Sequence, residues 1–159
     1  MGPHVGELES IARLALALAA GAVLGWERES KQKPAGLRTH MLVSLGSATF
    51  LLIALRYQDD SAKPGLDALK VVAGIVGGVG FLGGGSIIRA RGAVSGITTA
   101  ATIWVAAALG SAAAMGYYVI VAACLALALF TLLLLGALER RFFSTNNGSD
   151  AAIRNEDDS

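Results

Sequence analysis

Apolar residues occur along the chain in long stretches that are separated by short polar segments. The longest uncharged stretch covers residues 92–138, which are 47 positions without a charged side chain. One helical crossing of a bilayer takes about 20 apolar residues, so this stretch is long enough for two crossings. No ordinary soluble core requires an uncharged stretch of this length. The pattern therefore predicts an all-α polytopic membrane protein that is surrounded by lipid.

About five transmembrane helices fit the apolar pattern. We expect them to belong to a single transmembrane domain over residues 1–143, followed by a disordered cytoplasmic tail over the polar residues 144–159. Arg13 lies one turn inside the first helix, where its long stem can carry the charge to the membrane interface. The predicted spans are residues 8–26, 37–55, 69–88, 97–115 and 117–138.

The composition narrows the class of protein further. Hydrophobic residues make up 54% of the chain and charged residues only 16%, with a net charge of +1, so nothing indicates nucleic-acid binding. The single Cys124 cannot form an internal disulfide. The sequence has no Ser-His-Asp set, no Cys/His metal spacing and no phosphate-binding loop in a strand-to-helix context. We expect a protein that is not an enzyme and uses no cofactor.

The basic residues near the helix ends predict the orientation. Lys and Arg collect on the cytoplasmic side of bacterial membranes. With five spans, one side holds eight of them and the other side four. We therefore expect the N-terminus outside and the C-terminus in the cytoplasm. The eight are Arg28, Lys31, Lys33, Arg38, Arg89, Arg91, Arg140 and Arg141; the four are Arg13, Arg56, Lys63 and Lys70.

Glycines concentrate in the third predicted span. Small residues spaced four apart let helix backbones approach closely in lipid, so glycine-rich packing faces are one interpretation. The other starts from Gly83, Gly84 and Gly85, since each glycine in a helix costs about 1 kcal/mol relative to alanine. These three could interrupt the helix and expose backbone carbonyls to an ion or a substrate. The sequence leaves both interpretations open.

A charged block lies where the first two helices meet. Glu27, Arg28 and Glu29 end the first helix, and the second begins with Arg38, Thr39 and His40. One interpretation is interfacial anchoring, with Glu27 or Glu29 paired to Arg38. The other is a proton-sensitive or cation-binding site formed by Glu27 and His40. Glu27 and Glu29 point to different sides of a helix, which disfavours a tight magnesium site, and the metal stays unknown.

A second basic segment precedes the fourth helix. Arg89 and Arg91 come just before Thr98 and Thr99, with Ser95 as the expected helix cap. Anchoring by positive charge is one interpretation of the two arginines. The alternative is a site for an anion or a lipid headgroup, in which the start of the fourth helix supplies backbone donors.

Two blocks of sequence resemble the MgtC/SapB family of bacterial inner-membrane proteins. The first contains GWERE at 25–29 and KPAGLRTHMLVSLG at 33–46; the second, at 77–118, contains GFLGGG followed by GITTAATIW. The resemblance covers nearly all of residues 8–138. It implies about five membrane helices in the bacterial inner membrane. Many members also carry a soluble domain of the ACT type, which we do not expect in this chain.

The family resemblance also suggests functions. Its prototype is tied to growth in low magnesium and to survival inside macrophages, and it is regarded as a regulator that restrains the ATP synthase. We therefore expect a regulatory protein that acts on another membrane complex, such as ATP synthase, during magnesium limitation or acid stress. Independently of the resemblance, the exposed packing faces of five small-residue-rich helices lead us to expect a homodimer. One alternative is a small ion or solute transporter, with its path along residues 77–85 and a cytoplasmic mouth at Glu27, Arg38 and His40. Another is a structural or lipid-binding module.

Overall fold

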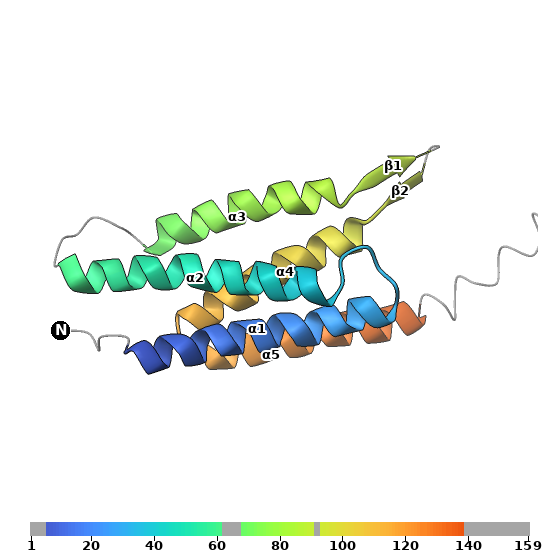
Figure 1. The fold of residues 1–159 in the computed structure, drawn as a ribbon. Coiled ribbons are helices and arrows are strands. Elements are labelled where there is room, and N and C mark those ends of the chain that lie inside the picture. The colour runs from blue at the N-terminus through green and yellow to red at the C-terminus, as the bar shows by residue number, and fades with distance from the viewer. Residues whose placement is uncertain (1–5, 62–67, 91–92, 139–159) are drawn as a thin grey trace, which may run out of the picture.

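The computed structural model describes residues 6–61, 68–90 and 93–138. Within these residues, five helices are long and apolar enough to cross a membrane, so the all-α polytopic fold is confirmed. One short β-hairpin connects the third and fourth helices (Figure 1). The elements in chain order are α1 (Glu7–Ser30), α2 (Leu37–Ser61), α3 (Ala68–Gly85), β1 (Ile88–Ala90), β2 (Ala93–Ser95), α4 (Ile97–Ala114), α5 (Tyr118–Phe130) and the π-helical turn η1 (Thr131–Leu135).

The helix ends differ from those expected from hydropathy. α1 continues to Ser30, and α3 stops at Gly85, three residues before the expected end. Ile88 belongs instead to β1, which pairs antiparallel with β2 in the register Ile88↔Ser95. Hydropathy marks where the chain is apolar, whereas helix ends depend on which groups satisfy the last backbone donors and acceptors. The predicted tail over residues 144–159 lies outside the described residues.

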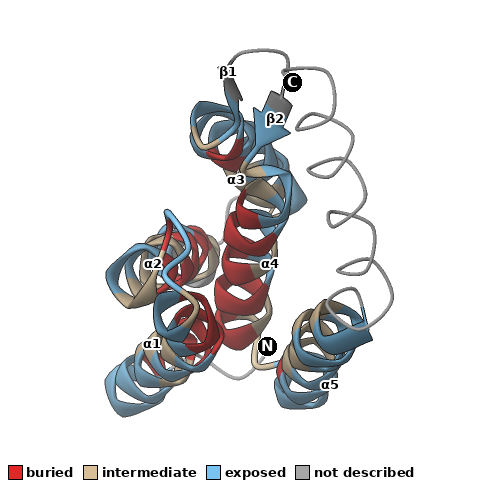
Figure 2. Cartoon of the chain, turned by 90° about the vertical axis from the view of Figure 1, so that its right-hand side faces the viewer, coloured by how far each residue is buried: buried red, intermediate tan, exposed pale blue. Residues whose placement is uncertain are grey.

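α4 is the central helix of the bundle. It contacts the other four membrane helices, and ten of its 18 residues are buried. Figure 2 shows this buried helix with α1 and α2 on one side, α3 beyond one edge and α5 beyond another. α3 and α5 are peripheral, because the only buried residues in α3 are Val79 and Gly83, and in α5 only Val121. The core therefore lies among α1, α2 and α4.

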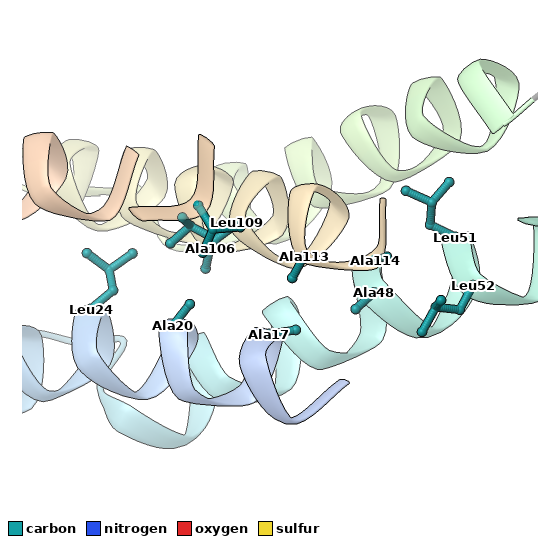
Figure 3. Packing of buried hydrophobic residues seen from close by; sticks show 11 residues of the cluster. Ala17, Ala20, Leu24, Ala48, Leu51, Leu52, Ala106, Leu109, Ala113 and Ala114 are labelled. Carbon is teal, nitrogen blue, oxygen red and sulfur yellow. The ribbon is translucent and has the colours of Figure 1, made fainter. Parts of the chain in front are cut away.

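The core is built from small side chains that let the helices touch. Alanine and leucine from the three central helices form one cluster, shown in Figure 3. A Cβ added at Gly110 of α4 would lie only 2.0 Å from the carbonyl oxygen of Ser44 in α2. One added at Gly21 of α1 would lie 2.6 Å from the carbonyl oxygen of His40. These glycines fix the spacing of the central helices, since no other residue fits there.

The glycines of α3 do not make the close helix contacts that their spacing predicts. A Cβ built on Gly74, Gly77, Gly78, Gly80, Gly84 or Gly85 would meet nothing within 4 Å in the described chain. α3 is helical through Gly83 and Gly84 and ends at Gly85, so the interrupted-helix interpretation is wrong. Close packing within the chain is also wrong for most of these glycines. Their small surfaces face away from the core.

Polar contacts at both ends hold the bundle together. The Arg13 guanidinium donates to the carbonyl oxygen of Ala114, at 2.6 Å, and lies 2.5 Å from the Glu9 carboxylate. Arg13 is therefore partnered inside the protein rather than reaching out to the interface.

At the opposite end of the bundle, α4 begins after Gly96 and not after a Ser95 cap. Gly96 has φ +91°, and a Cβ there would lie 2.0 Å from the carbonyl oxygen of Ser86, so glycine is required.

Candidate functional site

Charged and polar side chains from three helices meet at the end of the bundle where α1 stops and α4 starts. We call this set the polar cluster. Most of its members are buried although they lie in an otherwise apolar protein. Polar groups at such positions are costly unless they are paired, which makes them candidates for function. The polar cluster consists of Glu27, Arg28 and Lys31 from the end of α1, His40 from α2, and Thr99 and Thr102 from α4.

The Glu27 carboxylate is the negative centre of the polar cluster. Its side chain is 6% exposed, and it lies 2.5 Å from the Lys31 ammonium and 3.6 Å from the Arg28 guanidinium. Lys31 also donates to the carbonyl oxygen of Leu132 in the π-helical turn, at 3.3 Å. Neither carboxylate oxygen of Glu27 has a well-directed hydrogen bond, so the two ion pairs are what stabilise its charge. Glu27 therefore links the end of α1 to the π-helical turn η1 through Lys31.

His40 joins α2 to α4 inside the polar cluster. It is fully buried, with Nδ1 at 2.8 Å from the carbonyl oxygen of Gly36 and Nε2 at 3.0 Å from the Thr102 hydroxyl. Because a carbonyl only accepts, Nδ1 carries a hydrogen. The Thr102 hydroxyl also lies 2.9 Å from the carbonyl oxygen of Thr99. Its single hydrogen bonds to Nε2 when His40 is neutral and to Thr99 when His40 is charged.

Glu29, Arg38 and Thr39 are not part of the polar cluster. The Glu29 carboxylate accepts a hydrogen bond from the backbone N–H of Leu37, at 2.9 Å, and so caps α2. Arg38 and Thr39 are exposed on the outer side of α2. The expected pairing of Glu27 or Glu29 with Arg38 is therefore wrong: Glu27 pairs within its own helix, and Glu29 satisfies a backbone donor instead.

Of the remaining predicted site residues, only Thr99 belongs to the polar cluster. Thr99 is 2% exposed and accepts a long hydrogen bond, 3.4 Å, from Arg28, whereas Thr98 is exposed on the first turn of α4. Arg89 lies in β1, where it pairs with Val94, and Arg91 falls outside the described residues. Gly83 sits against Ala100 of α4. The structure thus brings Glu27, Arg28, His40 and Thr99 together in the polar cluster, and Thr98 shares a pocket lining with Arg28 and Thr99.

Two members of the polar cluster were missed by sequence reasoning. Lys31 was interpreted only as a topology signal, although it lies four residues after Glu27, the spacing of a helical ion pair. Thr102 was not among the predicted site residues, although its position one turn after Thr99 puts both hydroxyls on one face of α4. Among the described residues, no group of three His, Cys, Asp or Glu side chains is placed to hold a metal ion.

A second feature is an apolar groove between α2 and α3. It has a volume of about 740 Å³ and is lined by positions 42–57 of α2 and 71–82 of α3. Gly74 and Gly78 of α3 and Gly46 and Ser47 of α2 are small residues in its lining. Phe50 is 64% exposed beside it. We call it the α2–α3 groove; it faces the position that lipid would occupy.

The chain is similar to known bacterial proteins. It is 44% identical over 115 residues to Protein SrpB of Synechococcus elongatus, covering 67% of this chain and 63% of that protein. It is 42% identical over 113 residues to the putative magnesium transporter YhiD of Escherichia coli K12, covering 69% and 53%. It is 42% identical over 108 residues to Protein MgtC of Salmonella typhimurium LT2, covering 68% and 44%.

The matched region coincides with the membrane helices. The chain spans about half the length of these curated relatives, and no solved structure matches it. The model of the MgtC family matches residues 14–141, which include the polar cluster, the α2–α3 groove and almost all of the five helices. A match over most of the chain, together with these identities, establishes the relationship. This multi-pass membrane protein belongs to the MgtC family.

Proposed function

We propose that this chain is a regulatory protein of the bacterial inner membrane that binds a transmembrane helix of another membrane complex. The α2–α3 groove is the observation that carries the proposal. It follows α2 for about 22 Å, most of the thickness of a bilayer core. Lipid chains fill an apolar groove as well as a protein helix does, so a selective contact needs small residues that allow backbones to approach. Gly74 and Gly78 provide them.

The arrangement of the central helices supports a regulator over a carrier. α1, α2 and α4 are in backbone contact through Gly21 and Gly110, which leaves the core filled by alanine and leucine side chains. The condition of action that we propose is magnesium limitation or acid stress, as the family resemblance implies. His40 is the titratable group that would report acid, since its protonation would change which acceptor the Thr102 hydroxyl bonds to.

We also propose the orientation that the basic residues predict, with the N-terminus outside. The polar cluster then faces the cytoplasm. Single cysteines introduced at Ser30 and at Arg56, in a Cys124→Ser background, test it with a membrane-impermeant thiol reagent. Cysteine at 56 is expected to react in intact cells and cysteine at 30 only after lysis. The reverse pattern contradicts the orientation.

Co-purification from native membranes tests the regulatory proposal. The matched variants are Gly78→Leu, which fills the α2–α3 groove, and Gly77→Leu, which changes the neighbouring glycine outside the groove lining. We expect the parent and Gly77→Leu to retain a second membrane protein and Gly78→Leu to lose it. Two differently tagged copies distinguish a partner protein from a second copy of this chain. Retention by Gly78→Leu, or no second protein with the parent, contradicts the proposal.

Magnesium transport is the second candidate. It is favoured by the name of the relative from Escherichia coli, a putative magnesium transporter, and by the charged polar cluster at one end of the bundle. Liposomes that contain only this protein and a magnesium-sensitive dye test it. Uptake that is lost in Glu27→Gln and kept in Glu29→Gln would support transport. Equal dye signals with and without protein would exclude it.

A further inference from the structure

A pocket separate from the α2–α3 groove opens beside the polar cluster. It has a volume of about 1000 Å³ and lies between the end of α1, the β1–β2 hairpin, the start of α4 and the π-helical turn η1. Arg28, Lys31 and Lys33 line it, and no Asp or Glu is among the described residues of its lining. We call it the basic pocket. Its charge predicts an anionic ligand.

Arg28 contributes a buried charge that lacks a close partner. Its side chain is 5% exposed, and its Nε has no hydrogen-bond partner. The guanidinium donates to the Thr99 hydroxyl at 3.4 Å and lies 3.6 Å from the Glu27 carboxylate, and both distances are longer than a strong charge-assisted bond. Glu27 is moreover shared with Lys31, at 2.5 Å. A buried guanidinium in this state is stabilised by a further anion.

The start of α4 adds backbone donors to the basic pocket. Gly96 precedes the helix and supplies no side-chain cap, so the N–H groups of the first turn have no partner within the helix. The first turn, Ile97 to Thr99, lines the basic pocket, and Thr98 is exposed there. The N-terminus of an 18-residue helix favours negative charge, phosphate in particular. This feature and the unsatisfied Arg28 are independent of each other.

Part of the lining of the basic pocket is apolar. Ile88, Val94, Ile97 and Leu135 line it, and each is more than half exposed. An oxyanion with an apolar extension would cover these side chains, as a phospholipid does when its phosphate lies at the membrane interface.

We propose that the basic pocket binds a phosphate group through Arg28, Lys31, Lys33 and the first turn of α4, and that its apolar walls select an anionic phospholipid. The site is independent of whether the protein regulates or transports. Free phosphate presents the same oxyanion without the apolar part, so the experiment includes both sources.

Binding to the delipidated full-length protein tests the proposal. Native mass spectrometry measures retention of phosphatidylglycerol against phosphatidylcholine, and a thermal shift measures the effect of inorganic phosphate. We expect selective retention of phosphatidylglycerol and a smaller stabilisation by phosphate. Lys33→Gln is expected to weaken binding about fivefold, and Lys31→Gln with Lys33→Gln about 25-fold, since each basic group at a lipid surface contributes by a factor of this size.

Two further variants separate binding from folding. Arg38→Gln removes an exposed charge at the same end of the bundle but outside the basic pocket, so it is expected to bind like the parent. Thr98→Asp places a carboxylate at the start of α4, where it favours the helix and repels an anion. Its melting temperature should stay equal or rise while phosphatidylglycerol retention falls.

Three outcomes overturn the proposal. The first is a parent protein that retains both lipids equally and does not respond to phosphate. The second is a loss of binding in Arg38→Gln as large as in Lys33→Gln, which indicates a general charge effect. The third is unchanged retention in Thr98→Asp. Stabilisation by phosphate without lipid selectivity would support the oxyanion site and identify free phosphate as its source.

Discussion

The Nε2 atom of His40 in α2 lies 3.0 Å from the hydroxyl oxygen of Thr102 in α4, in a site from which solvent is excluded. Replacing Thr102 by valine keeps the shape of the side chain and removes this partner. We expect Thr102→Val to lower the free energy of unfolding by about 1 kcal/mol, a typical value for a hydrogen bond between membrane helices. Unfolding in mixed detergent and dodecyl sulfate measures the change.

Thr98→Val is the control for this prediction. Thr98 is one helical turn before Thr102 but exposed, so the same substitution should change the free energy of unfolding by less than about 0.5 kcal/mol. Equal losses in both variants would show that His40 does not depend on Thr102.

Replacing glycine by alanine at Gly110 and at Gly77 should change the free energy of unfolding in opposite directions. At Gly110 the added methyl would lie 2.0 Å from the backbone of α2, and separating α2 from α4 should cost about 1–3 kcal/mol. At Gly77 nothing lies within 4 Å, so alanine should stabilise α3 by up to about 1 kcal/mol. The same unfolding assay measures both. A stable Gly110→Ala protein would contradict the close contact of α2 and α4.

The substitutions Glu27→Gln and Glu29→Gln should lower the free energy of unfolding by different amounts. Glu27→Gln leaves Lys31 and Arg28 without their shared carboxylate, and a loss of the order of 3 kcal/mol is expected for a broken buried pair. Glu29→Gln keeps an oxygen that can accept the N–H of Leu37, so its effect should be below about 0.5 kcal/mol.

A double-mutant cycle checks the origin of this difference. Combining Glu27→Gln with Lys31→Gln should recover part of the lost stability, because neither charge is then left alone. If the double variant shows the plain sum of the two single losses, the ion pair is not the cause.

Gly96 offers a test of the hairpin that positions α4. Alanine there would be strained at φ +91° and would collide with the carbonyl of Ser86. We expect Gly96→Ala to lower the free energy of unfolding by at least about 1 kcal/mol. The control is Gly46→Ala, whose added methyl meets nothing within 4 Å. A stable Gly96→Ala protein would show that the hairpin can shift.

The five helices were predictable from the sequence because a membrane helix needs a long apolar stretch, and the long apolar stretches of this chain fit five spans. Gly21 and Gly25 of α1 have the four-residue spacing of a packing face, and both meet α2. For α3 the same spacing failed. Spacing identifies a face of small residues but not what covers that face, and in α3 the covering partner is not another helix of the described chain.

The candidate site was predictable only in part. Glu27 and His40 are ionisable groups next to apolar stretches, so their importance follows from the cost of burying charge. Their partners were not foreseen, because the rotation of α1 and α4 about their axes decides that Lys31 and Thr102 face inward. Arg38 was expected to pair but is exposed, since its position on α2 points away from α1 and α4.

The central place of α4 has a consequence for biosynthesis. α1, α2 and α3 enter the membrane before α4 does, yet the Nε2 atom of His40 finds its partner Thr102, and the backbone of Ser44 its close contact Gly110, only on α4. Insertion and tertiary assembly are therefore separate stages in this protein. A chain truncated before α4 would sit in the bilayer with unsatisfied polar groups, as a substrate for membrane quality control.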